Sequence, residues 1–351
     1  MLNEKLKKIY CESGAEALFI ETDFLRRFLT GFYSTDGFVI LDGESCKFIA
    51  DLRYYEAAER ELRGSVVEVV EGSYPKALEL IKKYHTIGVP YAFTNLSRAE
   101  ELKAAGFELK DCMPALKVAM EYKTEHEIAL IQKACDIAEE ALLKLMPQLK
   151  EGMTESETAA LLEYEMRKLG ASGVSFDTII AFGANSSVPH HETGNAKLKF
   201  GDIVLIDFGC KVEGYCSDCT RTFLFGDDGR HEEFKKAYAE VLKAHELVKE
   251  KTVAGMTGKE ADEVARASLR EAGLAQYFTH SLGHGIGLQV HEYPTLSPRG
   301  EEVLQDGMVY SDEPGVYLAG QYGIRIEDSC YMKDGKTVSF MRKTNRSLII
   351  L

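Results

Sequence analysis

Residues 152–170 read GMTESETAALLEYEMRKLG, and residues 255–273 read GMTGKEADEVARASLREAG, so one pattern occurs twice at an offset of 103 positions. Each copy begins Gly-Met-Thr, has a glutamate three residues after the threonine and ends on a glycine. A threonine and a glutamate at this spacing form a capping box that starts a helix, and a glycine is typical of a helix end. The repeat therefore predicts a C-terminal region built from two equivalent halves.

The repeat continues into segments whose apolar runs predict strands. Two pairs of these segments align: GDIVLIDFG (201–209) with GMVYSDEPG (307–315), and GYCSD (214–218) with GIRIE (323–327). Asp207 then corresponds to Glu313, and Asp218 to Glu327. We therefore expect an α+β fold in which an ααβββ unit is used twice about a pseudo-two-fold axis, with the four carboxylates converging between the halves.

The first part of the chain, residues 1–118, has a different pattern, in which helix and strand signals alternate. The expected elements include strands at GFVIL (37–41) and KFIA (47–50) and helices near residues 3–13 and 54–63. This alternation predicts a smaller α/β layer domain that serves packing or access, because no catalytic residue types cluster in it. A capping box at Thr124 opens the next long helix, so we place the second domain at residues 119–351.

The composition excludes several classes of partner. The 351 residues are 45% hydrophobic and 28% charged, as in ordinary globular proteins, and their net charge is −14. This charge would repel phosphate backbones and anionic lipid headgroups, so we expect neither nucleic acid nor membrane partners. The first 20 residues lack the apolar core of a signal peptide, and the eight cysteines are scattered along the chain. We therefore expect a cytoplasmic protein.

Four carboxylates in one partly buried pocket would repel one another and raise one another's pKa values unless cations balanced them. Two divalent ions supply the required charge, so the pattern predicts a dinuclear metal site. Oxygen-rich ligation suits hard or borderline ions, manganese foremost, whereas structural zinc typically has thiolate ligands. Cobalt, iron and zinc are the alternatives. Taken alone, Asp218 or Glu327 would be better explained by a surface position or an ion pair.

Histidines concentrate in two places. The stretch HSLGHGIGLQVHE contains His280, His284 and His291, and a second pair, His190 and His191, follows SSVP. His280 and His284 have the i, i+4 spacing of a metal-binding helix, but three glycines disfavour a helix there. We expect a glycine-rich loop or an irregular strand. Clustering favours a functional role for His190, His284 and His291, whereas His191 and His280 are equally compatible with a structural role.

Strand alternation predicts where several neighbouring side chains point. Cys216 and Cys219 resemble a Cys-x-x-Cys pair, but their side chains would face opposite ways, so we expect two core cysteines rather than a metal clamp. Arg325 shares the strand face of Glu327, where it is expected to hold that carboxylate or a substrate carbonyl. Asp312 faces the other way, and solvent or a local salt bridge is its expected setting.

At these residues the sequence resembles the pita-bread metallopeptidases, the group of methionine aminopeptidase, aminopeptidase P and prolidase. The matching stretches lie within residues 119–351 and are SSVPHH, IDFG, YCSDCTRTF, HSLGHGIGLQVHE, DEPGVY and GIRIED. The N-terminal part, with FLTGFYSTDGFVI and DLRYYEAA, looks like the extra domain of prolidases, aminopeptidases P and creatinases. The resemblance thus implies a creatinase/prolidase-like domain followed in the sequence by a pita-bread catalytic domain.

The resemblance implies that a metal pair has five protein ligands: Asp207, Asp218, His284, Glu313 and Glu327. Asp218 and Glu327 would bridge both ions, and a hydroxide between the ions would attack the carbonyl carbon. Glu313 would also relay the proton, His291 would stabilise the tetrahedral intermediate and His190 would assist the leaving nitrogen. Substrate contacts are expected from His190, His280, His291, Arg325 and Phe176.

The implied activity is that of an Xaa-Pro dipeptidase or Xaa-Pro aminopeptidase acting on peptides with proline at the second position, and a homodimer is expected. Since the proline nitrogen has no N–H, selectivity must come from the shape of the ring. A preference for dipeptides or for longer peptides stays open, because the sequence alone does not locate a cation for the proline carboxylate. The alternatives are a creatinase-like amidinohydrolase and a non-catalytic binding protein of the same fold, and the intact ligand set counts against both.

Overall fold

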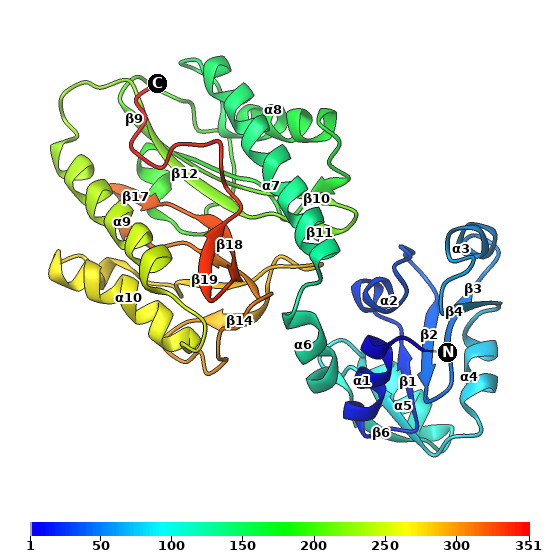
Figure 1. Ribbon diagram of the computed structural model, residues 1–351. Coiled ribbons are helices and arrows are strands. Elements are labelled where there is room, and N and C mark those ends of the chain that lie inside the picture. Colours follow the sequence, from blue (N-terminus) through cyan, green and yellow to red (C-terminus); the bar gives the residue numbers. More distant parts are fainter. Residues whose placement is uncertain (1) are drawn as a thin grey trace. The chain divides into compact units, whose positions relative to one another are not determined.

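The computed structural model describes residues 2–351 and consists of two compact units, Met1–Met120 and Glu121–Leu351 (Figure 1). Helix α6 (Met113–Glu121) runs from the first unit to the beginning of the second. The sequence places the corresponding domain boundary between residues 118 and 119. We refer to the two parts as unit 1 and unit 2.

Unit 1 is a mixed sheet of six strands in the order β4-β3-β2-β1-β5-β6. The strands are β1 (Ala17–Ile20), β2 (Phe38–Asp42), β3 (Cys46–Ala50), β4 (Val67–Glu71), β5 (Thr86–Val89) and β6 (Glu108–Asp111). The helices besides α6 are α1 (Glu4–Ser13), α2 (Asp23–Thr30), α3 (Tyr55–Glu61), α4 (Tyr74–Ile81) and α5 (Leu96–Ala104). Strand β2 is buried throughout because alternate side chains enter two cores, with Val39 on one face and Ile40 on the other. Helices thus cover both faces, as predicted for an α/β layer domain.

Unit 2 repeats one order of elements, a pair of helices followed by strands. The first half contains α7 (Glu125–Leu145), α8 (Glu155–Lys168), β7 (Gly173–Val174), β8 (Ile179–Phe182), β9 (Asp202–Phe208), β10 (Cys210–Val212), β11 (Tyr215–Cys216) and β12 (Cys219–Phe225). The second half contains α9 (Glu232–Lys251), α10 (Gly258–Glu271), β13 (Gly283–Gly285), β14 (Glu292–Leu296), β15 (Val309–Asp312), β16 (Gly315–Leu318), β17 (Tyr322–Arg325), β18 (Asp328–Lys333) and β19 (Lys336–Ser339). Short 3-10 helices lie at Met146–Gln148, Gly183–Ser187 and Ala275–Tyr277. The duplicated α+β fold predicted from the sequence is confirmed.

Helices α8 and α10 begin and end where the sequence predicts, and α7 begins where it predicts. Complete capping boxes form at Thr124, Thr154 and Thr257, because each threonine side chain accepts a backbone N–H and the glutamate three residues later accepts the N–H of the threonine. Gly170 and Gly273 follow α8 and α10 with φ angles of 106° and 71°, which glycine adopts without strain. Both copies of the repeat therefore form the same helix with the same ends.

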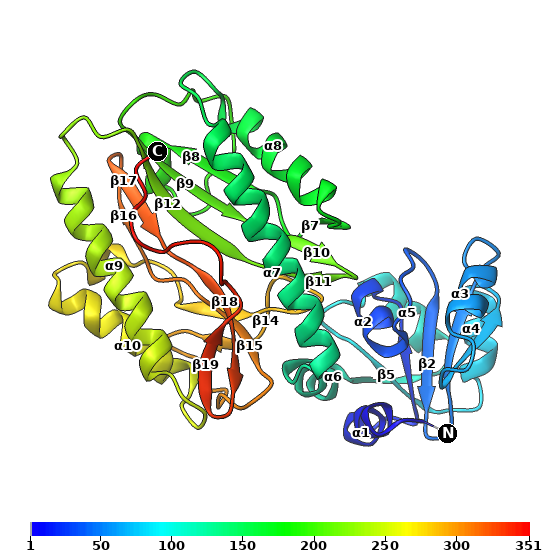
Figure 2. The same ribbon diagram turned by 45° about the horizontal axis from the view of Figure 1, so that its top comes forward.

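The two halves of unit 2 meet through their strands. Helices α7 and α8 pack on one side of these strands and α9 and α10 on the other (Figures 1 and 2). The first half forms the sheet β12-β9-β8, and the second forms β14-β13-β15-β18-β19. Strand β12 and the residue before it bond to the other half: the Thr222 hydroxyl bonds the backbone of Arg325, and the Ser329 hydroxyl bonds the backbone of Asp218. These contacts join the halves beside the aligned acids.

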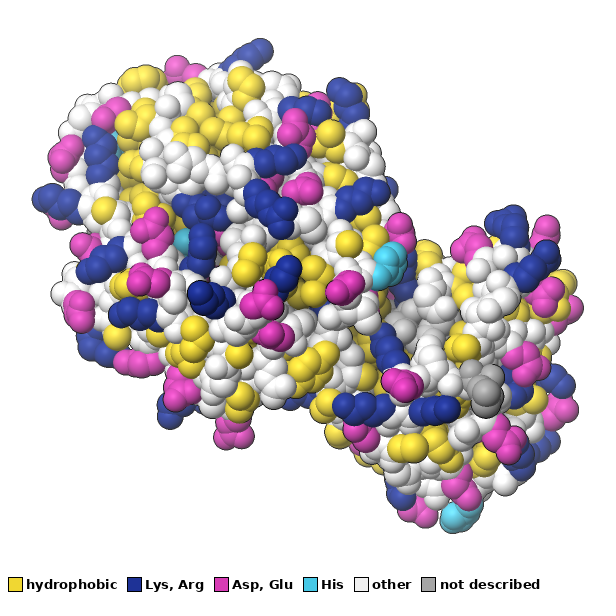
Figure 3. Space-filling model, viewed as in Figure 1, with side chains coloured by type: hydrophobic (Ala, Val, Ile, Leu, Met, Phe, Trp, Pro, Cys, Tyr) yellow, Lys and Arg dark blue, Asp and Glu magenta, His cyan; other side chains and the backbone are white. Residues whose placement is uncertain are grey.

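The surface mixes both signs of charge. On the face seen in Figure 3, lysine and arginine side chains alternate with aspartate and glutamate over both units. Among residues 2–351, none of the helices combines the length and the apolar character that a membrane-spanning helix requires.

Candidate active site

One cavity of about 460 Å³ in unit 2 brings together side chains from both halves. Its lining includes every residue that the sequence predicts for the site: Phe176, His190, Asp207, Asp218, His280, His284, His291, Glu313, Arg325 and Glu327. The other lining residues are Asp177, Ile179, Pro189, Ser281, Gly283, Val290 and Thr295. The duplication thus identified that the four distant acids meet, whereas what each residue of the cavity can do depends on its contacts.

The four acids lie in strands or directly at their ends. Asp207 lies within β9, opposite Thr220 of β12. Asp218 lies between β11 and β12, Glu313 follows the last residue of β15, and Glu327 lies between β17 and β18. Because the backbone leaves the ladder at these breaks, the side chains there do not follow strict alternation. Sheet pairing therefore positions Asp207, and local breaks in the strands position the other three acids.

His284 is the middle residue of β13, which has an irregular register directly after it. A Cβ atom at Gly283 or Gly285 would overlap a carbonyl oxygen, that of Ser311 or Tyr293, so glycine lets the backbones approach closely. Of the two alternatives that the sequence left open, a glycine-rich loop or an irregular strand, the structure shows the irregular strand. The Nδ1 of His284 donates to the carbonyl of Gly285 at 3.1 Å, which leaves the lone pair of Nε2 free.

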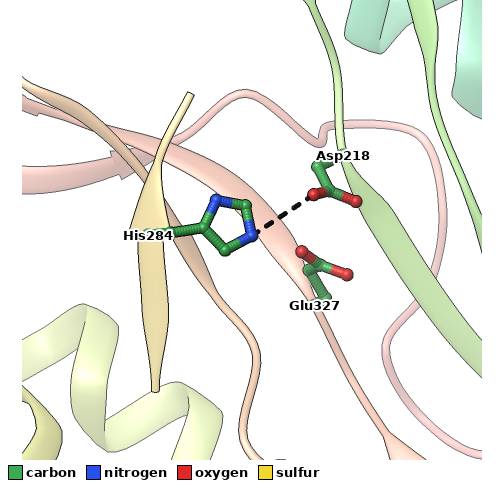
Figure 4. Close-up of side chains that lie close together, drawn as sticks. All are labelled: Asp218, His284 and Glu327. Atoms are coloured by element: carbon green, nitrogen blue, oxygen red, sulfur yellow. Dashed lines mark ion pairs between the residues drawn. The ribbon is translucent and has the colours of Figure 1, made fainter. Parts of the chain in front are cut away.

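The Nε2 atom of His284 points toward the acids. It lies 3.6 Å from Oδ2 of Asp218 and 3.3 Å from Oε1 of Glu313. Figure 4 shows Asp218, His284 and Glu327 directed toward one another from three separate segments, and each offers one ligand atom within 4.8 Å of the other two. Three of the five predicted ligands therefore form a compact group, and Glu313 lies beside it.

The charges of this group fit a divalent cation. Burial, reinforced by the charge of Glu327, raises the pKa of Asp218 well above its ordinary value. Burial also raises the pKa of Glu327 well above its usual range and that of Glu313 to about 8. Burial lowers the pKa of His284 to about 4, so its imidazole is neutral and able to coordinate a metal. A cation among these oxygens would offset both the burial and the repulsion, so the donor set fits the predicted metal centre.

Arg325 compensates the charge of Asp207. Its Nη2 donates to Oδ2 of Asp207 at 2.6 Å, its Nη1 donates to the hydroxyl of Tyr317 at 2.6 Å, and its Nε donates to Oγ1 of Thr220 at 2.9 Å. Arg325 reaches Glu327 through Thr220, whose hydroxyl accepts from Arg325 and donates to Glu327 at 2.6 Å, and the alternative contact with a substrate carbonyl stays a prediction. The Oδ1 of Asp207 is buried and has no hydrogen-bond partner among residues 2–351. One oxygen of Asp207 therefore stays available to a cation.

His280 lines the cavity, but its nitrogens already have protein partners. Its Nδ1 donates to the carbonyl of Ser281 at 2.8 Å, and its Nε2 accepts from the hydroxyl of Tyr317 at 2.9 Å. Burial lowers the pKa of His280 to about 3, so the ring is neutral. These contacts favour the structural role that the sequence left open over a substrate contact. Sequence reasoning missed Tyr317, whose only signal was its place in the motif DEPGVY.

The other predicted residues form the open part of the cavity. His190 and His291 are exposed, and the ring of His291 lies 4.2 Å from that of His284 between centroids. Partial burial and the nearby His190 lower the pKa of His291. Phe176 lies beside Ile179 in the lining, where the sequence predicts an apolar wall. A substrate can therefore reach two histidines that are not enclosed by the protein.

Asp312 departs from its expected setting. It is fully buried, and its Oδ2 lies 3.1 Å from Nδ1 of His245 on α9, close enough for an ion pair but without the alignment of a hydrogen bond. The Nε2 of His245 lies 3.5 Å from Asp328. The predicted local salt bridge is confirmed, but solvent exposure is wrong because every residue of β15 is buried and the face turned away from the cavity packs on α9. No local pattern in the sequence marked His245 as its partner.

Cys216 and Cys219 are both buried, as predicted for core residues. The Sγ of Cys216 lies 3.8 Å from the carbonyl oxygen of Leu288, and burial raises the pKa of this thiol to about 11. Burial also raises the pKa of Cys219 well above its usual value. Neither thiol is therefore poised to become a thiolate ligand.

Comparison with known proteins agrees with this geometry. The model of metallopeptidase family M24 matches residues 129–334, and that of the creatinase/prolidase N-terminal domain matches residues 3–119. An Xaa-Pro dipeptidase of Pyrococcus furiosus is 35% identical over 349 residues, which cover 99% of each chain.

Two solved structures show the same fold over nearly the whole chain. The Xaa-Pro dipeptidase from Bacillus anthracis has a TM-score of 0.94 at 33% identity, covering 99% of this chain and 98% of that one. The X-Pro aminopeptidase from Thermotoga maritima MSB8 has a TM-score of 0.91 at 35% identity, covering 99% of each chain. The chain therefore belongs to metallopeptidase family M24, whose members hold divalent metal ions, and it has the pita-bread catalytic domain and the creatinase/prolidase N-terminal domain expected from the sequence.

Proposed function

We propose that this protein is an Xaa-Pro peptidase, which removes an N-terminal residue from in front of a proline with two divalent ions, manganese foremost, as cofactors. The observation that carries the proposal is the single cavity, where acids and a neutral histidine from both halves converge beside two exposed histidines. Relatives named Xaa-Pro dipeptidase and X-Pro aminopeptidase support it, since they match this chain over nearly its full length.

The ligands proposed for the ions are Asp207, Asp218, His284, Glu313 and Glu327. Bound there, divalent ions would act as Lewis acids and make a nucleophilic water available near neutral pH. The remaining tasks fall to side chains of the cavity. They are to take a proton from the water, to stabilise charge on the carbonyl oxygen and to protonate the leaving nitrogen.

Glu313 is the proposed proton acceptor. Its Oε1 accepts from the hydroxyl of Ser311 at 3.0 Å and lies 3.3 Å from Nε2 of His284, so the carboxylate is held at the centre of the site. Without a cation, burial raises its pKa to about 8, and divalent ions bound at the site would offset that burial and leave Glu313 an ionised carboxylate. As an ionised carboxylate at the centre of the site, Glu313 can accept a proton from the water.

The exposed histidines are the proposed donors. His291 would donate to the carbonyl oxygen as negative charge develops there, and His190 would deliver a proton to the departing nitrogen. A proline nitrogen has no N–H to donate, so recognition depends on the fit of its ring against an apolar wall. Phe176, Ile179 and Val290 supply such a surface in the cavity lining.

An activity assay with metal and chelator arms tests the proposal. The purified protein with Mn²⁺ or Co²⁺ should hydrolyse Ala-Pro or Ala-Pro-Ala and spare Ala-Ala, and a chelator should abolish the activity. The relative rates on the two proline peptides distinguish a dipeptidase from an aminopeptidase. If neither proline peptide is cleaved with either metal, the non-catalytic interpretation takes precedence.

The homodimer implied by the family resemblance remains a prediction. The chain has a mass of 39.1 kDa, so sedimentation velocity should give about twice this mass in solution. Sedimentation as a 39.1 kDa species at assay concentration would contradict it.

A further inference from the structure

Glu155 is a buried acid outside the cavity and the first residue of α8, with a side chain only 1% exposed. It accepts four hydrogen bonds from the loop of residues 182–194: from Phe182 N at 2.9 Å, Asn185 Nδ2 at 2.8 Å, His191 Nε2 at 2.9 Å and Gly194 N at 3.0 Å. Its Oε1 accepts from the two donors at the start of the loop, and its Oε2 accepts from the two donors at the end. One carboxylate therefore closes the 182–194 loop, which contains His190.

The second half of unit 2 holds the opposite side of this loop. The hydroxyl of Ser186 accepts from the backbone N–H of Gly323 at 2.9 Å, and that of Ser187 accepts from Gly320 at 3.1 Å. A Cβ at Gly323 would overlap the carbonyl oxygen of Ser186, so the loop and β17 are in close backbone contact. The loop is thus fixed between Glu155 and the β16–β17 hairpin, and His190 extends from it into the cavity lining.

The contacts of Glu155 are those of an ionised acceptor. A buried carboxylate is costly unless hydrogen bonds satisfy it, and here four donors do so at the positively polarised start of a helix. Burial raises the pKa of Glu155, but the hydrogen bonds from Asn185, His191 and two backbone groups outweigh burial and lower it below the ordinary value. The carboxylate therefore remains ionised and can accept all four bonds, with His191 donating through Nε2.

The second half of unit 2 uses a corresponding device. Asp262 on α10 is buried, accepts the backbone N–H of Leu282 at 2.9 Å and binds Nε of Arg266 at 2.6 Å. Arg266 in turn donates to the carbonyls of Phe278 at 3.1 Å and His280 at 2.5 Å. An acid on the second helix of each half thus anchors the loop that brings histidines to the cavity, which independently supports a positioning role.

We infer that Glu155 is a positioning residue for His190. Its bonds to His191 and Gly194 set where His190 enters the cavity, and Glu155 itself touches no substrate. The expected effect on catalysis rests on the proposed function, in which His190 serves the leaving nitrogen, whereas the effect on the loop does not.

The substitution Glu155→Gln tests this role, because glutamine keeps one acceptor oxygen but presents an amide NH₂ group to the donors at one end of the loop. On Ala-Pro-Ala with Mn²⁺, kcat should fall roughly 10- to 100-fold, as displacement of a reacting group by about 1 Å implies, while KM and bound Mn²⁺ stay near the parent values. Amide hydrogen exchange in residues 182–194 should become faster. Glu157→Gln is the matched control, since Glu157 lies on the same helix and caps its start without touching this loop.

A second pair of variants keeps the test decisive if Glu155→Gln does not fold. In His191→Gln the amide nitrogen can replace Nε2 as a donor, whereas His191→Leu removes the donor. We expect His191→Gln to retain most of kcat and slow exchange, and His191→Leu to behave like Glu155→Gln.

Equal kcat in the Glu155→Gln and Glu157→Gln proteins would overturn the positioning role, and so would equal losses in the two His191 variants. Exchange in residues 182–194 that stays at the parent rate would overturn loop closure itself. If the parent chain cleaves no proline peptide, the proposed function fails separately, and the exchange comparison between Glu155→Gln and Glu157→Gln still decides whether this acid closes the loop.

Discussion

The two halves of unit 2 share one order of elements but fill matching buried positions with opposite charges. Glu139 on α7 and His245 on α9 are 106 positions apart, the same offset that relates Asp207 to Glu313. Glu139 accepts the backbone N–H groups of residues 342–344 at distances of 2.7 to 3.1 Å. His245 instead lies between the carboxylates of Asp312 and Asp328.

This difference shows that two halves with the same backbone fold can have different side-chain chemistry. In the first half, the buried acid on the first helix holds a distant chain segment, so its task is structural. In the second half, the histidine is the cation beside Asp312 and shares Asp328 with Arg221 and Arg346, so it balances charge next to the proposed metal ligands Glu313 and Glu327. The helix caps, in contrast, occupy equivalent positions in both halves, and each half also anchors a loop with an acid on its second helix, Glu155 or Asp262. The features that both halves share determine the fold, whereas the features that differ determine how the buried charges are balanced.

The largest effects should come from one ligand of each half. Asp218→Asn and Glu327→Gln should each lower bound metal well below the parent and reduce kcat/KM on the order of 100-fold or more, because a lost ion removes several kcal/mol of transition-state stabilisation. Metal analysis by mass spectrometry and the peptide assay check this. Asp177→Asn, which changes an exposed acid of the same lining, is the control for metal content. Unchanged occupancy in Asp218→Asn would show that the bridging assignment is wrong.

The exposed histidines provide the next comparison, again with one from each half. His190→Ala and His291→Ala should lower kcat by about 10²- to 10⁴-fold, the usual contribution of a positioned proton donor. Bound metal should not change, since neither residue is a proposed ligand. Steady-state kinetics combined with metal analysis measures both properties. A variant that loses metal along with activity would assign that histidine to the metal centre instead.

Replacing His245 should lower the free energy of unfolding more than replacing Glu139, its counterpart in the first half. His245→Gln leaves the buried Asp312 without its cation, while Asp328 keeps Arg221 and Arg346, and should cost about 3–5 kcal/mol of the free energy of unfolding. Glu139→Gln keeps an acceptor oxygen and should cost only about 1–3 kcal/mol. Urea unfolding measures both, with His126→Gln on the exposed surface of α7 as the control. Equal losses at positions 139 and 245 would remove the contrast drawn between the halves.

The free energy of unfolding should depend on pH through the titration of His245. Although burial lowers it, the pKa of His245 is raised to about 9 by Asp312 and Asp328. A raised pKa means that its stabilisation is complete below the unfolded pKa of about 6.5 and is lost as pH rises through about 9. Thermal unfolding between pH 6 and pH 10 should therefore show a decline in the parent that is reduced in His245→Gln. A decline of the same size in both proteins would assign it to other groups.

The smallest effects should be equal in the two halves. Thr154→Ala and Thr257→Ala each remove the side chain that caps the second helix of a half, and each should cost about 1 kcal/mol of the free energy of unfolding. Thr154→Ser and Thr257→Ser keep the hydroxyl and should cost much less. A clear inequality between the two alanine variants would show that the repeated helices are not equivalent in energy.

Much of the fold and the membership of the site could be predicted because their signals are local or repeated. A capping box involves residues three positions apart, and the duplication aligned Asp207 with Glu313 and Asp218 with Glu327 before any contact was known. The glycines around His284 likewise predicted an irregular strand. In unit 1, the expected strands at 37–41 and 47–50 lie within one residue of β2 and β3, but β1 and α2 were not predicted.

The contacts that assign tasks within the site were not predictable in this way. Alternation placed Arg325 on the face of Glu327, but β17 ends at Arg325, and the guanidinium binds Asp207, 118 positions away. Alternation also turned Asp312 away from the cavity correctly, yet it could not show that the other side of β15 is covered by a helix. A strand pattern reports the direction of a side chain and not what lies opposite it.

The sequence by itself determined the duplicated architecture, the capped starts of α7, α8 and α10 and the meeting of the four acids, because these depend on short spacings and on a repeat within the chain. Only the tertiary structure decided that Arg325 compensates Asp207, that Tyr317 engages His280 and that Glu155 closes the loop of His190. The physical reason is that a buried charge is stabilised by whichever partners folding brings within hydrogen-bond distance, and those partners come from segments far apart in the chain.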